Sequence, residues 1–102
     1  MNRLTIPAKS PLETIEQQFD FASLFTSGAT ISSVSATAAV YSGADSTPSS
    51  VIGTVTSSGT VATVPLKAGV DGVIYLITVQ ATSISSDVSV IQAFLAVVAS
   101  LA

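Results

Sequence analysis

The residue types that most often carry out chemistry in proteins are scarce in this chain of 102 residues. It contains no histidine and no cysteine, which removes the commonest general base, the commonest metal ligand and the thiol nucleophile. Serine is abundant, but neither the G-x-S-x-G nucleophile elbow nor an S-x-x-K motif occurs. Any catalysis would therefore depend on carboxylates.

The carboxylates do not form a pattern that is typical of an active site. Asp45-Ser46-Thr47 resembles the Asp-Thr/Ser-Gly loop of aspartic peptidases, but Thr47 stands where that loop requires glycine, so we reject this interpretation. Acid–base catalysis needs two well-placed groups, whereas Glu13, Glu16 and Asp20 follow the outer face of one segment and the other acidic residues stand singly in separate loops. The sequence predicts a solvated acidic face and no catalytic residue.

Three loop aspartates are the remaining candidates for a metal site. Asp45, Asp71 and Asp87 could hold calcium if their loops met at one end of the fold, because Ca²⁺ takes oxygen ligands. No D-x-D-x-D-G pattern supports such a site. We therefore expect no metal and no cofactor.

The low charge of the chain narrows the classes of partner. Charged residues make up 9% of the sequence and the net charge is −3, whereas soluble domains typically carry about 25% charged residues. With 3 basic residues the chain is a poor match for phosphate backbones, so we expect no nucleic-acid partner. No apolar run approaches the roughly 20 residues that span a bilayer, and the N-terminus has no apolar signal-peptide segment, so we expect no membrane partner.

Serine and threonine take the place of the missing charges. The chain contains 29 of them, together with many valines and isoleucines that disordered segments lack. An uncharged surface associates easily. This composition indicates a folded domain that packs against other subunits.

Alternation of apolar and polar residues predicts a series of short strands. It is clearest over residues 13–21, 29–43 and 73–82, and residues 51–67 are typical of a hairpin that turns at Ser57-Ser58-Gly59. The small inward residues of the second segment need large residues opposite them, and the phenylalanines of the first segment are the candidates.

The last segment, residues 88–98, has two interpretations. Helical spacing is matched by Val88, Ile91, Leu95 and Val98, but the β-branched residues and the preceding strand and turn favour a strand. Residues 1–12 contain two prolines and are expected to form an extended arm, with a short edge strand at Leu4–Ile6. The arm would precede a single domain over residues 13–102.

Six or seven short strands separated by regular turns predict an all-β fold, an immunoglobulin-like antiparallel β-sandwich. In such sandwiches a tyrosine near the start of one strand hydrogen-bonds to loop backbone a few residues upstream. Asp71-Gly72 precede Tyr75 with the spacing of this tyrosine corner. A buried phenol needs a partner, and we expect loop carbonyls to supply it; the alternative is a plain aromatic residue at the edge of the core.

The segment around Tyr75 is apolar on both of its predicted faces. Tyr75, Ile77 and Val79 share one face, and Ile74 and Leu76 share the other. One face of a sandwich sheet usually meets water. We therefore expect a cover, supplied by residues 1–12 or by a neighbouring subunit.

Five segments together resemble small virion proteins of tailed bacteriophages that consist of one immunoglobulin-like domain. These segments are AKSPLETIEQQFDFAS (8–23), GATISSVSATAAV (28–40), DSTPS (45–49), SGTVATV (58–64) and DGVIYLITVQAT (71–82). The tail VIQAFLAVVASLA is apolar, whereas the relatives typically end in charged strands. The resemblance implies a non-enzymatic structural component of the virion, assembled in the cytoplasm of a bacterial host.

Within the virion, the leading hypothesis is a capsid decoration or cement protein that binds the major capsid protein, copies of itself, or both. The alternative is a neck, tail or head-fibre component, present in few copies per particle. A host-surface adhesion module is a third hypothesis, for which Tyr41 is the exposed aromatic residue. The subunit contacts that we expect are Leu4, Ile6, Leu12, Leu95, Val97 and Leu101.

Overall fold

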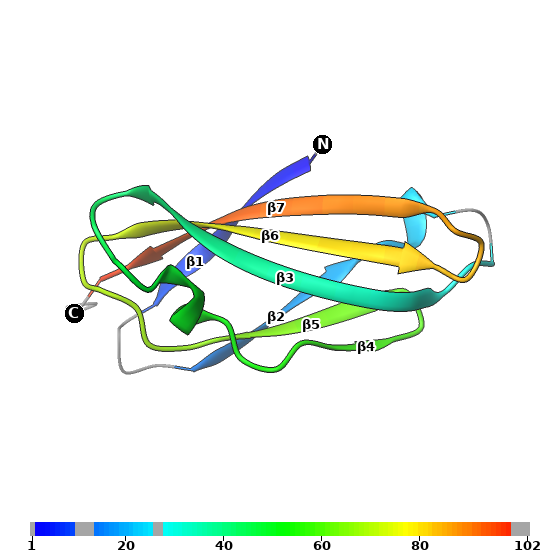
Figure 1. Ribbon diagram of the computed structural model, residues 1–102, viewed down its shortest axis with the longest axis horizontal. Helices are drawn as coiled ribbons and strands as arrows, with labels where there is room; N and C mark the ends of the chain where they lie inside the picture. Colours follow the sequence, from blue (N-terminus) through cyan, green and yellow to red (C-terminus); the bar gives the residue numbers. More distant parts are fainter. Residues whose placement is uncertain (1, 10–13, 26–27, 99–102) are drawn as a thin grey trace.

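The protein is a β-sandwich of two sheets packed face to face (Figure 1). The computed structural model describes residues 2–9, 14–25 and 28–98, with residues 2–9 described by their backbone alone. Sheet A has the strand order β1-β7-β6-β3, and sheet B has the order β2-β5-β4. The described elements are β1 (Asn2–Lys9), β2 (Ile15–Asp20), the 3-10 turn η1 (Ala22–Leu24), β3 (Ile31–Ser42), the 3-10 turn η2 (Pro48–Val51), β4 (Thr56–Ser58), β5 (Val61–Leu66), β6 (Ile74–Ser83) and β7 (Val88–Val97). The prediction of an all-β sandwich is confirmed.

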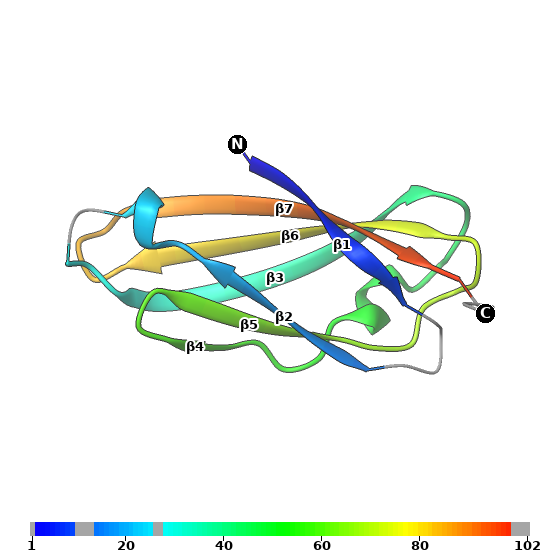
Figure 2. The ribbon, with the colours of Figure 1, turned by 180° about the vertical axis from the view of Figure 1, so that it is seen from behind.

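Sheet A is built around β6, which pairs antiparallel with β3 on one side and with β7 on the other. The expected edge strand at Leu4–Ile6 lies within the longer β1, which runs parallel to β7 (Figure 2). The register between these two strands shifts between Ile6 and Lys9, where Pro7 cannot donate a ladder hydrogen bond. Residues 2–9 therefore form one edge of sheet A in this structure.

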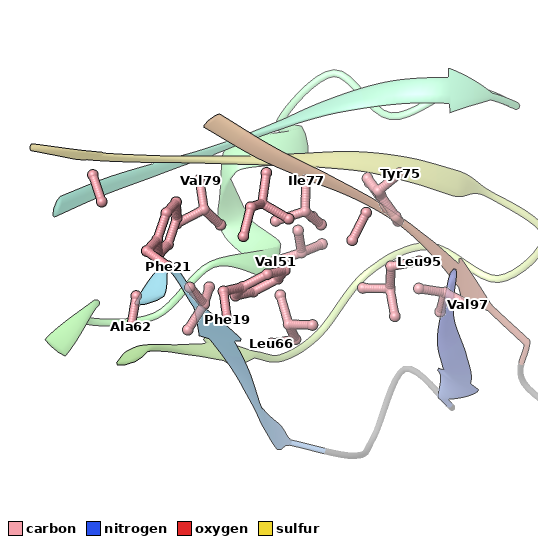
Figure 3. Packing of buried hydrophobic residues seen from close by; sticks show 14 of the residues in the cluster. Phe19, Phe21, Val51, Ala62, Leu66, Tyr75, Ile77, Val79, Leu95 and Val97 are labelled. Atoms are coloured by element: carbon pink, nitrogen blue, oxygen red, sulfur yellow. The ribbon is translucent and has the colours of Figure 1, made fainter. Parts of the chain in front are cut away.

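The core lies between the two sheets and follows the predicted alternation. Phe19 of β2 and Phe21, which directly follows β2, point toward Ile77 and Val79 of sheet A. All four side chains are buried (Figure 3). Phe25 stacks on Phe21, with ring centroids 5.7 Å apart. The short inward side chains of β3, Val34, Ala36, Ala38 and Val40, are partly buried and pack against this core.

The region 51–67 differs in part from the expected hairpin. The expected first strand is shorter than predicted: residue 51 ends η2 and is buried in the core, and β4 begins only at Thr56. The turn between β4 and β5 is made by Gly59 and Thr60, and Gly59 has a φ of +60° that glycine adopts without strain. The expected second strand of the hairpin is β5.

The last segment is a strand and not a helix. Its residues Val88–Ala96 pair with β6 throughout, and the inward positions Ile91, Ala93, Leu95 and Val97 are buried. β-branched residues fit this pleated, half-buried surface. No helix among the residues that the structure describes is long and apolar enough to cross a membrane.

Candidate interaction surface

Tyr75 joins three segments at one end of the sandwich. Its side chain is completely buried. Its hydroxyl donates a hydrogen bond to Oδ2 of Asp45, 2.7 Å away, and accepts one from the backbone N–H of Val70, 2.8 Å away. Asp45 in turn accepts hydrogen bonds from the backbone N–H and the hydroxyl of Thr47. The loops that follow β3 and precede β6 are thus tied to the start of β6.

The backbone partner of this tyrosine is an amide and not the expected carbonyl. The phenol has one proton, and the carboxylate of Asp45 takes it. The oxygen can then accept from the Val70 amide, which lies five residues upstream. Of the predicted corner residues, Gly72 has a φ of +84° and its N–H donates to the carbonyl of Val97, while Asp71 lies beside it in the same turn.

The same contacts shift two pKa values in opposite directions. The pKa of Asp45 is lowered, first by the hydrogen bond from the Thr47 amide and then by the one from Tyr75. Burial raises the pKa of Tyr75, and the neighbouring Asp45 raises it further. Both shifts favour a neutral phenol beside a charged carboxylate.

The outward face of sheet A carries an apolar patch near this end. We call Tyr41, Ile74, Leu76, Phe94 and Ala96 the outer patch. Tyr41 is 61% exposed, and its ring packs edge-on against Phe94 with centroids 4.7 Å apart. Leu76 lies opposite Phe94 in the β6–β7 register, and Ile74 lies opposite Ala96. An aromatic pair on an apolar row is a common feature of protein-binding surfaces.

The other half of the same face is polar but uncharged. A shallow hollow of about 190 Å³ is lined by Ser33, Val34, Ser35, Gln80 and Thr82. Between the hollow and the outer patch, Gln92 donates a hydrogen bond to the hydroxyl of Thr78. None of the outward positions of β3, β6 and β7 is a charged residue. These three strands therefore offer a partner no charge that must be desolvated.

The exposed face of sheet B carries acidic residues. Glu16, Gln18 and Asp20 alternate along the exposed face of β2, as predicted. Asp20 is held in place by hydrogen bonds from the hydroxyl of Thr60 and the backbone N–H of Ala22. The outward positions of β3, β6 and β7 are thus uncharged, whereas the exposed face of β2 is acidic.

The predicted subunit contacts fall in three different places. Leu12 and Leu101 lie outside the described residues, while Leu4 and Ile6 lie in β1, in register with Ala93 and Leu95. The prediction for Leu95 and Val97 is wrong. Their side chains are 0% and 1% exposed because they point into the core of this chain, so they offer no surface to a neighbour. The side chains of β7 that a neighbour could reach are those of its outward face.

The three candidate calcium ligands do not meet. Asp45 follows the end of β3, next to the start of β6, whereas Asp87 lies in the turn after β6, at the opposite end of that strand. No cluster of three or more acidic residues that could hold a metal occurs within the described ranges. Asp87 instead accepts a hydrogen bond from the hydroxyl of the buried Ser83, a structural contact that no sequence pattern predicted.

Comparison with known proteins identifies a family for this architecture. The sequence matches the family model described as podophage GP4 fiber-tail adaptor protein gp77 over residues 9–92. The match includes β2 to β6, the Tyr75 network and part of β7. A search of curated proteins found no significant match.

Proposed function

The chain belongs to the family of the podophage GP4 fiber-tail adaptor protein gp77, and on that premise we propose that it joins a fibre to the tail of a phage particle. As a member of this family it is a structural component of the virion that contacts other virion proteins. The family match over residues 9–92 is the single observation that carries the proposal.

The family corrects the ranking of the two virion hypotheses. Capsid decoration, with the major capsid protein as partner, receives no support from the match, and the alternative of a tail or fibre component fits it better. The absence of histidine and cysteine supports a role in binding without catalysis.

We infer an immunoglobulin-like topology for the sandwich. Strands β2-β5-β4 opposite β7-β6-β3 follow the order B-E-D and G-F-C of an immunoglobulin constant domain, with β1 added beside β7. Tyr75 then stands near the start of the F strand, where a tyrosine corner is expected, and Val70 is its upstream backbone partner.

An adaptor must hold two different partners, and the two sheets of the sandwich present chemically different surfaces. The outer patch is uncharged and includes the exposed ring of Tyr41, whereas β2 displays Glu16 and Asp20. Burial of apolar surface contributes about 25 cal/mol per Å², so the outer patch is the stronger candidate for a tight contact. The long shape of the molecule, 43 × 20 × 19 Å, keeps its two ends apart.

Removal of the gene from the phage tests this proposal. We expect particles that keep heads and tails but lack fibres in electron micrographs, and we expect purified protein to restore fibre attachment. Quantitative mass spectrometry should find a copy number comparable to that of tail proteins and far below that of the major capsid protein. Fibres that remain attached without this protein, or an abundance matching the major capsid protein, would contradict the proposal.

A further inference from the structure

The four edge strands of the two sheets are protected very unequally. Natural sheets prevent edge-to-edge association with charged residues, prolines, bulges or very short edge strands. Edge strand β1 contains Arg3, Pro7 and Lys9 and a register shift, and β4 has three residues. Edge strand β2 contains Glu16 and Asp20. Each of these three edges therefore carries at least one protective feature.

The fourth edge strand, β3, carries none of these features between Ser33 and Val40. It has 12 residues, ISSVSATAAVYS, without a charge or a proline. Its register with β6 is irregular only at its ends, between Ile31 and Ser33 and between Val40 and Ser42. The strand order leaves its other side without a neighbour in the sheet (Figure 1). A long and uncharged edge of this kind is a template for another strand.

The partial burial of β3 also indicates that its edge is open to another strand. Its inward residues Val34, Ala36, Ala38 and Val40 are only half-buried, whereas the inward residues of β6 beside them are completely buried. The short turn η2 packs near the end of β3 that leads into it (Figure 1). The backbone N–H of Ile31 already donates a hydrogen bond to the carbonyl of Gly59. The part that another strand can reach is therefore about residues 32–38.

We propose that the free edge of β3 pairs antiparallel with β3 of a second copy of this chain, which extends sheet A across a two-fold axis. The strand is self-complementary: an antiparallel pairing centred on Ser35 sets Ser33 opposite Thr37 on the outward side and Val34 opposite Ala36 on the inward side. Polar residues then meet polar residues and apolar residues meet apolar ones, as an isologous contact requires.

Charge also favours a second copy at this edge. The chain carries a net charge of −3, so two copies repel one another in general. Approach along β2 would bring Glu16 and Asp20 of each copy close to those of the other. Approach along β3 brings no charged side chain of either edge strand into opposition.

The area of the contact sets its expected strength. Seven residues of strand are roughly 23 Å long, and with a sandwich about 10 Å thick they bury on the order of 200 Å² per copy. Stable interfaces bury about 800 Å² per partner. We therefore expect a weak dimer of the isolated chain, with a Kd on the order of 100 µM, that becomes significant where the particle holds copies side by side.

Self-association of the purified chain tests the proposal without any fibre or tail protein, so its outcome is independent of the adaptor role. Sedimentation from about 10 µM to about 1 mM should show a rising average mass. Over the same range, amide hydrogen exchange of β3 should slow, while that of the edge strand β2 stays constant. A chain that is monomeric throughout would overturn the proposal.

Substitutions separate β3 pairing from other modes of association. Ser35 is exposed, so Ser35→Lys should leave the monomer folded and should raise the Kd at least about tenfold, because two ammonium groups would meet near the axis. Ser35→Thr should keep the dimer. Gln18→Lys, at an exposed position of β2, is the matched control for added charge and should also keep it.

Two further results would overturn the proposal. The first is a dimer that Ser35→Lys leaves unchanged, since association would then use another surface. The second is protection of the β3 amides only after a fibre or tail protein is added, since the occupant of the edge would then be that protein and not a second copy.

Discussion

The hydroxyl of Tyr75 donates a hydrogen bond of 2.7 Å to the carboxylate of Asp45, thirty residues earlier in the chain. This contact connects the start of β6 with the loop after β3, and the amide of Val70 binds the same hydroxyl from a third segment. The outer patch begins at the same end of the sandwich, where Ile74 adjoins Tyr75 and Tyr41 lies near the end of β3. The network therefore fixes the loops next to the candidate interaction surface.

Tyr75→Phe tests the energetic value of this network. The substitution keeps the ring but leaves the Val70 amide and the Asp45 carboxylate without the hydroxyl. We expect a loss of about 1–3 kcal/mol in the free energy of unfolding, the usual cost of a partly buried group left unsatisfied. Urea denaturation measures it. Tyr41→Phe is the matched control and should change stability by less than about 0.5 kcal/mol, because this side chain is exposed.

The pH dependence of stability follows from the two shifted pKa values. The lowered pKa of Asp45 means that its contribution is present above about pH 4 and is lost as the pH falls through the folded-state pKa. The raised pKa of Tyr75 means that its contribution is present below about pH 10 and is lost as the pH rises toward the folded-state pKa. Denaturation curves should show Asp45→Asn with a weaker acid limb and Tyr75→Phe with a weaker alkaline limb. Unchanged limbs in both variants would contradict the assigned contacts.

Gly69 and Gly72 form a matched pair for testing the packing of the loop before β6. Both have positive φ, +99° and +84°. A Cβ at Gly69 would lie 2.8 Å from Cγ2 of Val97, whereas a Cβ at Gly72 would have nothing within 4 Å. Each alanine variant should lose about 1–2 kcal/mol from backbone strain, and Gly69→Ala should lose a further 1–3 kcal/mol or so from overpacking. Equal losses in thermal denaturation would show that the loop moves away from Val97 freely.

Ser83 has a similar structural role at the opposite end of the sandwich. Its buried hydroxyl accepts hydrogen bonds from the backbone N–H groups of Ser85 and Asp87 and donates one to the Asp87 carboxylate. Ser83→Ala leaves both amides without this acceptor, and we expect it to cost about 1–3 kcal/mol in the free energy of unfolding. Ser85→Ala, at an exposed position of the same turn, should be nearly neutral. A neutral Ser83→Ala would mean that water replaces the hydroxyl.

The strands were predictable where one face is buried, and less so elsewhere. Alternation places Phe19 and Ile77 inward, because a slip of one residue would turn the apolar side chains of a strand toward solvent. It could not place Val51, whose burial depends on a 3-10 turn without strand pattern. It also assigned Leu95 and Val97 to the surface, because a strand with apolar residues on both faces does not reveal which face meets the core.

The partners of Tyr75 show a different limit of the sequence. The hydroxyl's upstream backbone contact lies five residues away, within the reach of a local pattern. Asp45 lies thirty residues away in a loop, and only the packing of that loop against the start of β6 brings it to the hydroxyl. Long-range pairs of this kind have no spacing signal in a single sequence.

Cryo-electron microscopy of intact particles, compared with particles that lack this protein, tests the adaptor role most directly. The difference density should have the size and two-layered shape of the sandwich, and it should lie between the tail and the base of each fibre. Density on the capsid surface, or fibres joined to the tail with no such density between them, would contradict the role proposed here.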